Sequence, residues 1–206
     1  MDERVAVITG GSSGIGAELA RRLVADGWRC VLVARGEERL REVAGELGAE
    51  AEVCDVGDRA SVEALAARVT ERHPRIKLLV NNAGIPGRAD FIAGDPDRIE
   101  NAMRINYLGG VWCLRAFLPA LEAAAPADVV NVVSVAGTVV MPPSGPYGAS
   151  KHAQLAFSRA TSTHRQPAAT SSRARSAPIP LEPPVITATR SSMAAEATSS
   201  CRRSSH

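Results

Sequence analysis

The sequence predicts an α/β fold built on a doubly wound parallel sheet. Short apolar runs typical of buried parallel strands alternate with stretches in which apolar residues recur at helical spacing, and a glycine-rich turn directly follows the first run. Strands that alternate with helices form parallel sheets covered on both faces. The alternation stops near residue 162, so we expect a sheet truncated after about five strands and followed by a disordered or irregular tail.

The elements follow one another regularly along the chain. Strands are predicted near residues 4–9, 29–34, 50–54, 76–81 and 128–134. Helices are predicted near residues 15–26, 37–47, 59–72, 97–125 and 147–162. Apolar side chains wrap most of the circumference of the helix at 97–125, which predicts burial on more than one side.

The turn after the first strand has the composition of a phosphate-binding loop. Gly10, Gly14 and Gly16 follow the apolar run in the spacing Gly-x-x-x-Gly-x-Gly. Glycines allow a tight turn and a close approach of a pyrophosphate, and the next helix offers free N–H groups and its positive dipole end to the anion. A purely structural turn is the alternative explanation of these glycines.

An arginine stands where a nucleotide ribose is expected. The second strand ends at Ala34 and Arg35, where an enzyme that prefers NAD often carries an acid. A guanidinium suits the 2′-phosphate of NADP by its charge and its forked donors. We therefore expect NADP, with NAD as the alternative. Glu37 and Glu38 follow closely and could weaken the effect, and Arg35 could instead be a surface arginine.

Tyr147, Lys151 and Ser134 have the residue types and spacing of a proton-transfer site. Tyrosine and lysine at positions i and i+4 of a helix point to the same side. A lysine ammonium there lowers the pKa of the phenol from about 10 toward neutrality, so that the tyrosine can act as a general acid or base. Ser134 could hold the same substrate oxygen. A half-exposed tyrosine beside a solvated lysine is the alternative.

Taken together, these motifs resemble the classical short-chain dehydrogenase/reductase family, whose fold is Rossmann-like. The resemblance covers roughly residues 3–162. It rests on the segments Thr9–Gly16 and Asn81–Gly84, on Asn106 and Ser134, and on Tyr147 with Lys151, which occur in the family's order and spacing. No other explanation accounts for all of these motifs at once.

The resemblance implies a role for each matching residue. Asn106, Ser134, Tyr147 and Lys151 match the catalytic tetrad, with the tyrosine as general acid/base, the lysine on the nicotinamide ribose, and the asparagine holding a helix kink and a water. The residues that match cofactor-binding positions are Thr9, Gly10, Ser12, Ser13, Gly14, Ile15, Gly16, Arg35, Asp55, Val56, Asn82, Ala83, Gly84, Tyr147 and Lys151. No metal site is expected.

Each of these residues also has a purely structural explanation. Asn106 could be a satisfied polar group in an apolar helix, and Asp55 could cap the helix that begins near Asp58. Ser134 could be an ordinary strand-end serine, and the segment Asn81–Gly84 could be only a turn.

Composition divides the chain into two parts near residue 162. All 17 glycines precede this point, whereas the remainder is rich in Ser, Thr, Pro and Arg and lacks helix and strand periodicity. We expect a dinucleotide-binding and catalytic domain at residues 1–162 and an atypical low-complexity tail at residues 163–206. The tail is either an out-of-frame translation or a divergent linker or partner-binding segment.

These observations support two hypotheses of different classes. The first is an oxidoreductase that transfers a hydride between NADP(H) and a carbonyl or alcohol, with Tyr147 as general acid/base. The second is a catalytically incompetent nucleotide-binding remnant, because the family's sixth and seventh strands and substrate lid have no counterpart in the sequence after residue 162. The substrate itself is not predicted.

Overall composition narrows the partners. A net charge of +2 gives no reason to expect nucleic acid, and no apolar run approaches the roughly 20 residues that span a bilayer. The four cysteines lack metal or redox spacing, which suits a reducing compartment. Because Met1–Arg4 leads straight into the first predicted strand, we expect no signal peptide. We expect a cytoplasmic protein with a small-molecule carbonyl or alcohol substrate, and the resemblance implies a homo-oligomer.

Overall fold

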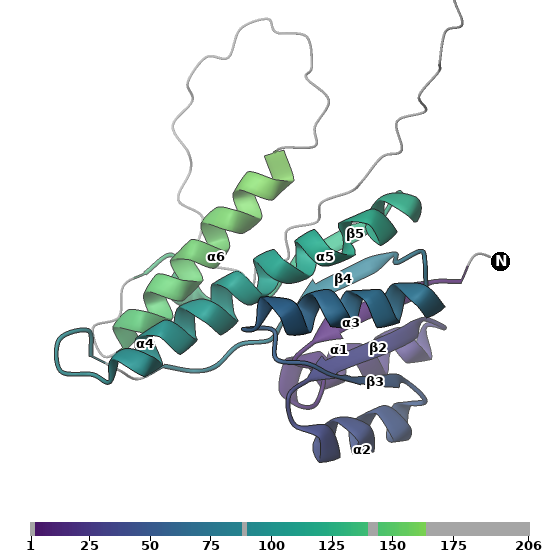
Figure 1. The fold of residues 1–206 in the computed structure, drawn as a ribbon, viewed down its shortest axis with the longest axis horizontal. Coiled ribbons are helices and arrows are strands. Elements are labelled where there is room, and N and C mark those ends of the chain that lie inside the picture. Colours follow the sequence, from purple (N-terminus) through teal and green to yellow (C-terminus); the bar gives the residue numbers. More distant parts are fainter. Residues whose placement is uncertain (1–2, 88–89, 140–143, 164–206) are drawn as a thin grey trace, which may run out of the picture.

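The computed structural model describes residues 3–87, 90–139 and 144–163 (Figure 1). The tail predicted to be irregular lies outside these residues from position 164 onward.

The described residues form a five-stranded parallel sheet, as predicted. Its strands are β1 (Val5–Thr9), β2 (Arg29–Ala34), β3 (Glu50–Val53), β4 (Leu78–Asn81) and β5 (Asp128–Asn131), in the order β3-β2-β1-β4-β5. The order reverses between β1 and β4, so the carboxyl ends of these two strands frame the crevice in which such folds bind ligands.

The strand register brings the carboxyl ends to a common edge. Thr9 at the end of β1 is opposite Val33 of β2, and Asn81 at the end of β4 is opposite Asn131 of β5. The residues that directly follow each strand therefore lie near one another, although they come from distant parts of the sequence.

Helices cover both faces of the sheet (Figure 1). On one face, α1 (Gly14–Ala25) and α2 (Glu37–Leu47) enclose a core with Ile8 and Leu32. On the other face, α3 (Arg59–Arg72) and α5 (Gly109–Ala123) lie side by side over a core with Val7 and Phe117. Alternate residues of β1 thus pack into the two cores on opposite faces of the sheet, which explains why the strand is apolar throughout.

The single helix predicted at 97–125 is divided into three segments. It consists of α4 (Pro96–Met103), a π-helical turn η1 (Arg104–Leu108) and α5. The chain remains helical through Met103 and Gly109, which explains why sequence periodicity did not reveal the boundary. Asn106 lies within the π turn, and such turns often occur at functional sites.

The last predicted strand and helix have different boundaries in the structure. β5 ends at Asn131 rather than 134, and a 3₁₀ turn η2 (Val135–Gly137) follows. The final helix, α6 (Gly145–Thr163), begins two residues before the predicted start at Tyr147. It packs against η2, α4 and η1, and Figure 1 shows it alongside α4.

Among the described residues, β5 is an edge strand of the sheet. Val129 is 4% exposed because it packs into the core beneath α5, and Val130 and Val132 are half-buried against the opposite core. The apolar side chains are therefore covered on the sheet faces.

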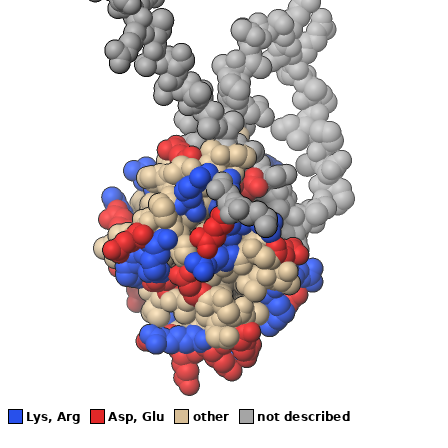
Figure 2. Space-filling view, turned by 90° about the vertical axis from the view of Figure 1, so that its right-hand side faces the viewer, with Lys and Arg blue, Asp and Glu red and all other residues tan. Residues whose placement is uncertain are grey.

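The surface carries both signs of charge. Figure 2 shows acidic and basic side chains interspersed over the face that it displays. Within the described residues, no helix combines the length and apolar character needed to cross a membrane.

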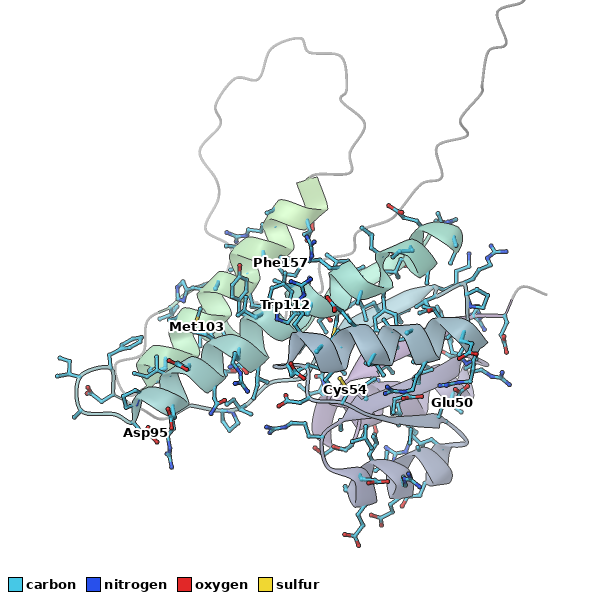
Figure 3. The ribbon with its side chains drawn as sticks, viewed as in Figure 1. Glu50, Cys54, Asp95, Met103, Trp112 and Phe157 are labelled. Atoms are coloured by element: carbon cyan, nitrogen blue, oxygen red, sulfur yellow. The ribbon has the colours of Figure 1, made fainter. Side chains whose placement is uncertain are left out.

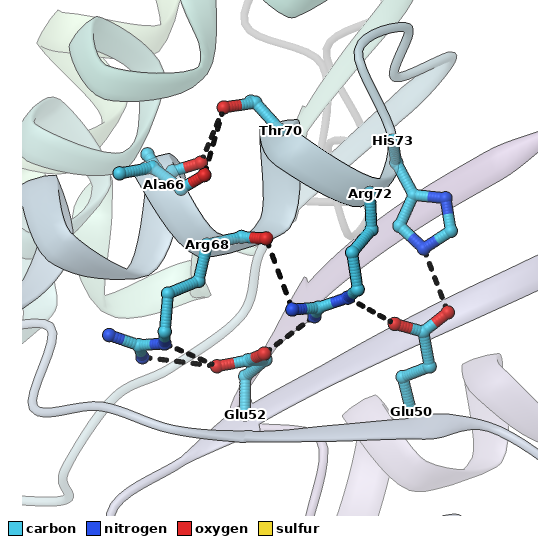
Figure 4. Close-up of polar contacts among 8 residues, drawn as sticks. Glu50, Glu52, Ala66, Arg68, Thr70, Arg72 and His73 are labelled. Atoms are coloured by element: carbon cyan, nitrogen blue, oxygen red, sulfur yellow. Dashed lines mark hydrogen bonds and ion pairs between the residues drawn. The ribbon is translucent and has the colours of Figure 1, made fainter.

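The other sheet edge, β3, is held to α3 by a charged network (Figure 4). Glu52 accepts hydrogen bonds from Arg68 at 3.0 and 3.1 Å and from Arg72 at 2.6 Å. Glu50 contacts Arg72 at 3.2 Å and the buried ring of His73 at 2.8 Å. The Glu52 side chain is only 11% exposed, so its ion pairs are better shielded from solvent than those of an isolated surface pair.

We expect Glu52→Gln to lower the free energy of unfolding by about 1 kcal/mol, because the uncharged amide accepts more weakly from two arginines. Glu42→Gln is the matched control, since Glu42 pairs with Arg39 on the exposed surface of α2 and should cost less than about 0.5 kcal/mol. Urea unfolding of both variants measures the difference, and equal effects would contradict the structural role of the network.

Candidate active site

Thr9 and Asn82 join the carboxyl ends of β1 and β4. The buried Thr9 hydroxyl donates to the Val80 carbonyl at 3.2 Å and accepts from the backbone N–H groups of Asn82 and Ala83, both at 3.0 Å. The Asn82 side chain returns hydrogen bonds to the carbonyls of Thr9 at 2.9 Å and Gly10 at 3.2 Å. These contacts fix the glycine turn against the loop that follows β4.

Two glycines of the turn are required by its geometry. Gly10 has a φ of +67°, which favours glycine, and Gly16 packs so closely on the turn that an added Cβ would lie 2.3 Å from the Gly10 carbonyl oxygen. Gly16 therefore brings the start of α1 directly against the end of β1.

A cavity of about 460 Å³ opens above the carboxyl ends of β1 to β4. Nine of the predicted cofactor residues line it: Gly10, Ser12, Ser13, Ile15, Arg35, Val56, Asn82, Ala83 and Gly84. Six further lining residues were not predicted: Val33, Ala34, Gly36, Cys54, Ile85 and Ile105. Figure 3 labels Cys54, which follows the end of β3.

The N-terminus of α1 faces the same region. Ser13 is the N-cap residue, and within the described residues its side chain makes no capping hydrogen bond to the first turn. Gly14 has a φ of +54° and open space where a Cβ would stand. The first N–H groups of the helix and its positive dipole end are thus available to an anion.

Asp55 and Asp58 have different local roles. The Asp55 carboxylate accepts from the Gly57 N–H at 2.9 Å, whereas Asp58 caps α3 by accepting from Ala60 and Ser61. The alternative in which Asp55 caps this helix is therefore wrong. The expected role of Asp55 in cofactor binding stays a prediction.

The Asn106 carboxamide connects the loop after β4 with α6. Its oxygen accepts from the Ile85 N–H at 2.7 Å, and its nitrogen donates to the Ile85 carbonyl at 3.1 Å and to the Ser150 hydroxyl at 3.0 Å. Ser150 in turn donates to the Tyr147 carbonyl at 2.7 Å. The side chain is 1% exposed. Asn106 is thus a satisfied structural group that also positions the helix with the predicted tyrosine.

Lys151 and Tyr147 lie together on one side of α6. The Lys151 ammonium is 5.8 Å from the centroid of the Tyr147 ring, and it donates to the Val132 carbonyl at 3.1 Å and to Gln154 Oε1 at 2.8 Å. A Cβ on Gly84 would lie 3.7 Å from this ammonium and 3.3 Å from Asn106 Oδ1. Because Gly84 also lines the cavity, the side chains of Lys151 and Asn106 lie directly behind this part of the cavity wall.

Ser134 lies at the start of η2, which packs against α6. Its hydroxyl accepts from the Ala136 N–H at 3.2 Å and so caps the 3₁₀ turn. The structure therefore connects Asn106 with Tyr147 through Ser150 and places Lys151 beside the Tyr147 ring. Ser134 lies on a neighbouring element with a local hydrogen bond of its own.

Burial lowers the pKa of Lys151 from 10.5 to about 8. The Lys151 residue is only 5% exposed, and burial disfavours the charged form because it loses hydration there. An amine with a pKa this near neutrality changes its protonation state within the ordinary working range of enzymes.

Comparison with known proteins identifies the family. The model of the family described as short chain dehydrogenase matches residues 4–169. The chain belongs to the short-chain dehydrogenase family. This confirms the resemblance drawn from the sequence motifs.

Individual short-chain dehydrogenases cover most of the chain. Sulfoacetaldehyde reductase 2 of Chromohalobacter salexigens is 40% identical over 154 residues, which are 71% of this chain and 61% of the relative. An actinorhodin polyketide ketoreductase with NADPH has a TM-score of 0.76 and 35% identity, with 79% of this chain and 65% of that chain covered. A Burkholderia phymatum short-chain dehydrogenase in complex with NAD has a TM-score of 0.75 and 32% identity, with 79% and 60% covered.

The chain spans about half to two thirds of the length of the curated relatives it matches, from 50% to 64% for the first two. The family match over residues 4–169 includes every position of the predicted tetrad.

Besides these lining residues, two buried polar partners of the predicted tetrad were not predicted from the sequence. Ser150 and Gln154 lie three positions after Tyr147 and Lys151, respectively, and both are at most 2% exposed. The available signal was their spacing, since positions i and i+3 share a helix face. A buried polar side chain at that spacing from a predicted catalytic residue is a candidate partner for it.

We expect Gly16→Ala to lower the free energy of unfolding by about 1–3 kcal/mol, because the new Cβ meets the Gly10 carbonyl and the Asn82 amide. Gly45→Ala is the control: it lies in α2 with open space around its Cβ position and should stabilise the protein by about 0.5–1 kcal/mol. Thermal or urea unfolding measures both, and a neutral Gly16→Ala would contradict the close packing.

The lowered pKa of Lys151 predicts a pH-dependent stability. Between pH 8 and 10.5 the unfolded chain holds a proton on Lys151 that the folded chain has lost, so folded stability rises with pH in this window. Between these two pH values, the free energy of unfolding of the wild-type chain should rise by up to about 3 kcal/mol relative to that of Lys151→Met. Urea unfolding of both proteins at pH 7, 9 and 10.5 measures the gain, and a constant difference would contradict the lowered pKa.

Proposed function

We propose that the protein is an NADP-dependent oxidoreductase that interconverts a small-molecule carbonyl and its alcohol, with Tyr147 as general acid/base. The single observation that carries this proposal is the position of the Lys151 ammonium, 5.8 Å from the Tyr147 ring and directly beside the Gly84 wall of the cavity. The related ketoreductase with NADPH and the sulfoacetaldehyde reductase support the same reaction class.

The cavity fits a dinucleotide. The N-terminus of α1 offers N–H groups to a pyrophosphate, and Gly10 and Gly14 adopt positive φ angles that let the backbone come close to it. Arg35 lines the cavity at the end of β2 and supports NADP through its charge and forked donors. NAD is the alternative cofactor, and the related Burkholderia phymatum protein was solved with it.

The chain's residues manage a proton while the bound nicotinamide supplies the hydride. In reduction, the Tyr147 phenol donates its proton to the carbonyl oxygen, and in oxidation the phenolate accepts the alcohol proton. The Lys151 ammonium stabilises the phenolate and so favours this exchange near neutral pH. Ser134 binds the substrate oxygen. Asn106 connects the loop that follows β4 to α6 and so keeps the two in position.

We expect Tyr147→Phe to lower kcat by at least about 100-fold, because no phenol remains to exchange the proton. The chain has two tyrosines, and Tyr107→Phe is the matched control, since Tyr107 packs edge-on against Phe157 and should keep most of the activity. Consumption of NADPH with a panel of carbonyl compounds measures turnover, and fluorescence titration with NADPH checks that binding survives. Full activity of Tyr147→Phe would overturn the assigned role.

The same assay separates the two hypotheses about the chain. A wild-type protein that binds NADPH but consumes none with any carbonyl would favour the nucleotide-binding remnant over the enzyme.

We expect Arg35→Ala to raise the Kd for NADP by about tenfold or more and to leave the Kd for NAD nearly unchanged, because only NADP carries the 2′-phosphate. Arg41→Ala is the control, since Arg41 is an exposed arginine of α2 paired with Glu37. Calorimetric titration with both nucleotides measures the ratio. An equal loss for NADP and NAD would show that Arg35 does not read the phosphate.

A further inference from the structure

Gln154 is a buried polar residue with a direct contact to the Lys151 ammonium. The Gln154 carboxamide oxygen accepts from Lys151 Nζ at 2.8 Å, and its residue is 2% exposed. A lysine ammonium donates three hydrogen bonds and accepts none, so it orients the amide with its oxygen inward. The same ammonium donates a second bond, at 3.1 Å, to the carbonyl of Val132, the residue that directly follows β5.

We propose that Gln154 is a positioning residue for Lys151: its side-chain oxygen keeps the ammonium charged and holds it beside the Tyr147 ring. This inference rests on the proposed function only for the role of Lys151 in the reaction, because the contact itself does not depend on cofactor or substrate. The acceptor Gln154, the amine Lys151 and the phenol Tyr147 thus all lie on the same helix, α6.

The surroundings of Lys151 leave few other groups to stabilise its charge. Asn106 of η1 and the loop at Gly84 face it without a charge, and η2 carries no ionisable side chain. The titratable group that faces the ammonium is the Tyr147 phenol. The charged side chains of α4 and η1 are all exposed to solvent: Asp97, Arg98, Glu100 and Arg104.

An uncharged acceptor has a large effect in such a place. Burial disfavours the ammonium, and hydrogen bonds to the charged form oppose that loss. Removing the Gln154 oxygen should therefore lower the pKa of Lys151 further, whereas a carboxylate at the same position should raise it. A residue with only a packing role would produce neither shift.

The chain allows this to be measured on a single side chain. It contains two lysines, Lys77 and Lys151, so uniform ¹³C-lysine labelling gives two Cε signals in the full-length protein. Lys77 donates to the Ala124 carbonyl far from α6 and serves as the internal reference, and Lys77→Arg assigns the spectrum. The ¹³Cε shift is followed from pH 6 to 11 without nucleotide.

Two variants of Gln154 test opposite directions. Gln154→Met keeps the length of the side chain and removes the oxygen, and we expect the Lys151 midpoint to fall by roughly one pH unit, a tenfold change in acidity. Gln154→Glu keeps an acceptor and adds a charge, and we expect the midpoint to rise by roughly one unit or more.

The matched control is Ser158→Ala. Ser158 lies one turn further along the same face of α6, is fully buried and accepts from Asn131 at 3.1 Å, so its loss perturbs packing without touching the ammonium. The Lys151 midpoint should stay within about 0.3 units of wild type. Unchanged midpoints in Gln154→Met and Gln154→Glu would overturn the proposal. If Gln154→Met does not fold, the nearly isosteric Gln154→Glu decides alone.

A kinetic readout separates this inference from the proposed function. With an active carbonyl substrate, the pH profile of kcat/KM should shift in each Gln154 variant in the direction of the Lys151 midpoint. If the midpoints shift and the kinetic profile does not, the Gln154 contact stands and the participation of Lys151 in the reaction is wrong. If neither shifts, the positioning role of Gln154 is overturned.

Discussion

The structure of the site depends on one carboxamide, that of Asn106. It is buried in the π turn between α4 and α5. It accepts a hydrogen bond from the Ile85 N–H, donates one to the Ile85 carbonyl, and donates another to the Ser150 hydroxyl of α6. An α-helical continuation would use the same residues for regular helix bonds and rotate this side chain away. The π turn is therefore the local irregularity that joins the loop after β4 to the helix that carries Tyr147 and Lys151.

In the first half of the chain, the N–H groups at the start of α1 are open to an anion, while the polar groups at the neighbouring strand ends are hydrogen-bonded within the protein. Thr9 and Asn82 satisfy the polar groups at the ends of β1 and β4 internally. The start of α1 is left uncapped by Ser13, so its N–H groups face the cavity. Satisfied strand ends beside an open helix end are what a phosphate site requires.

Sequence patterns predicted the sheet and most helices because strand and helix periods differ and each strand is buried on two faces. They did not predict the π turn at Arg104–Leu108, since apolar residues wrap most of the circumference of the helix at 97–125 and leave no distinct face whose rotation would reveal an inserted residue. They also placed the end of β5 too late, because valines favour strands even where η2 follows. The roles of Ser150 and Gln154 depend on which helix face is buried, and that is decided by tertiary packing.

The sheet contributes directly to the surroundings of the Lys151 ammonium. One of its acceptors is the carbonyl of Val132, just beyond β5, and the position of β5 is fixed by a buried polar line. Asn81 of β4 donates to Asn131 of β5 at 2.9 Å, and Asn131 donates to Ser158 of α6 at 3.1 Å. This line ties the carboxyl ends of β4 and β5 to α6. The asparagines at the ends of β4 and β5 therefore hold the edge strand against α6, while the direct acceptors of the Lys151 ammonium are the Val132 carbonyl and the Gln154 side chain.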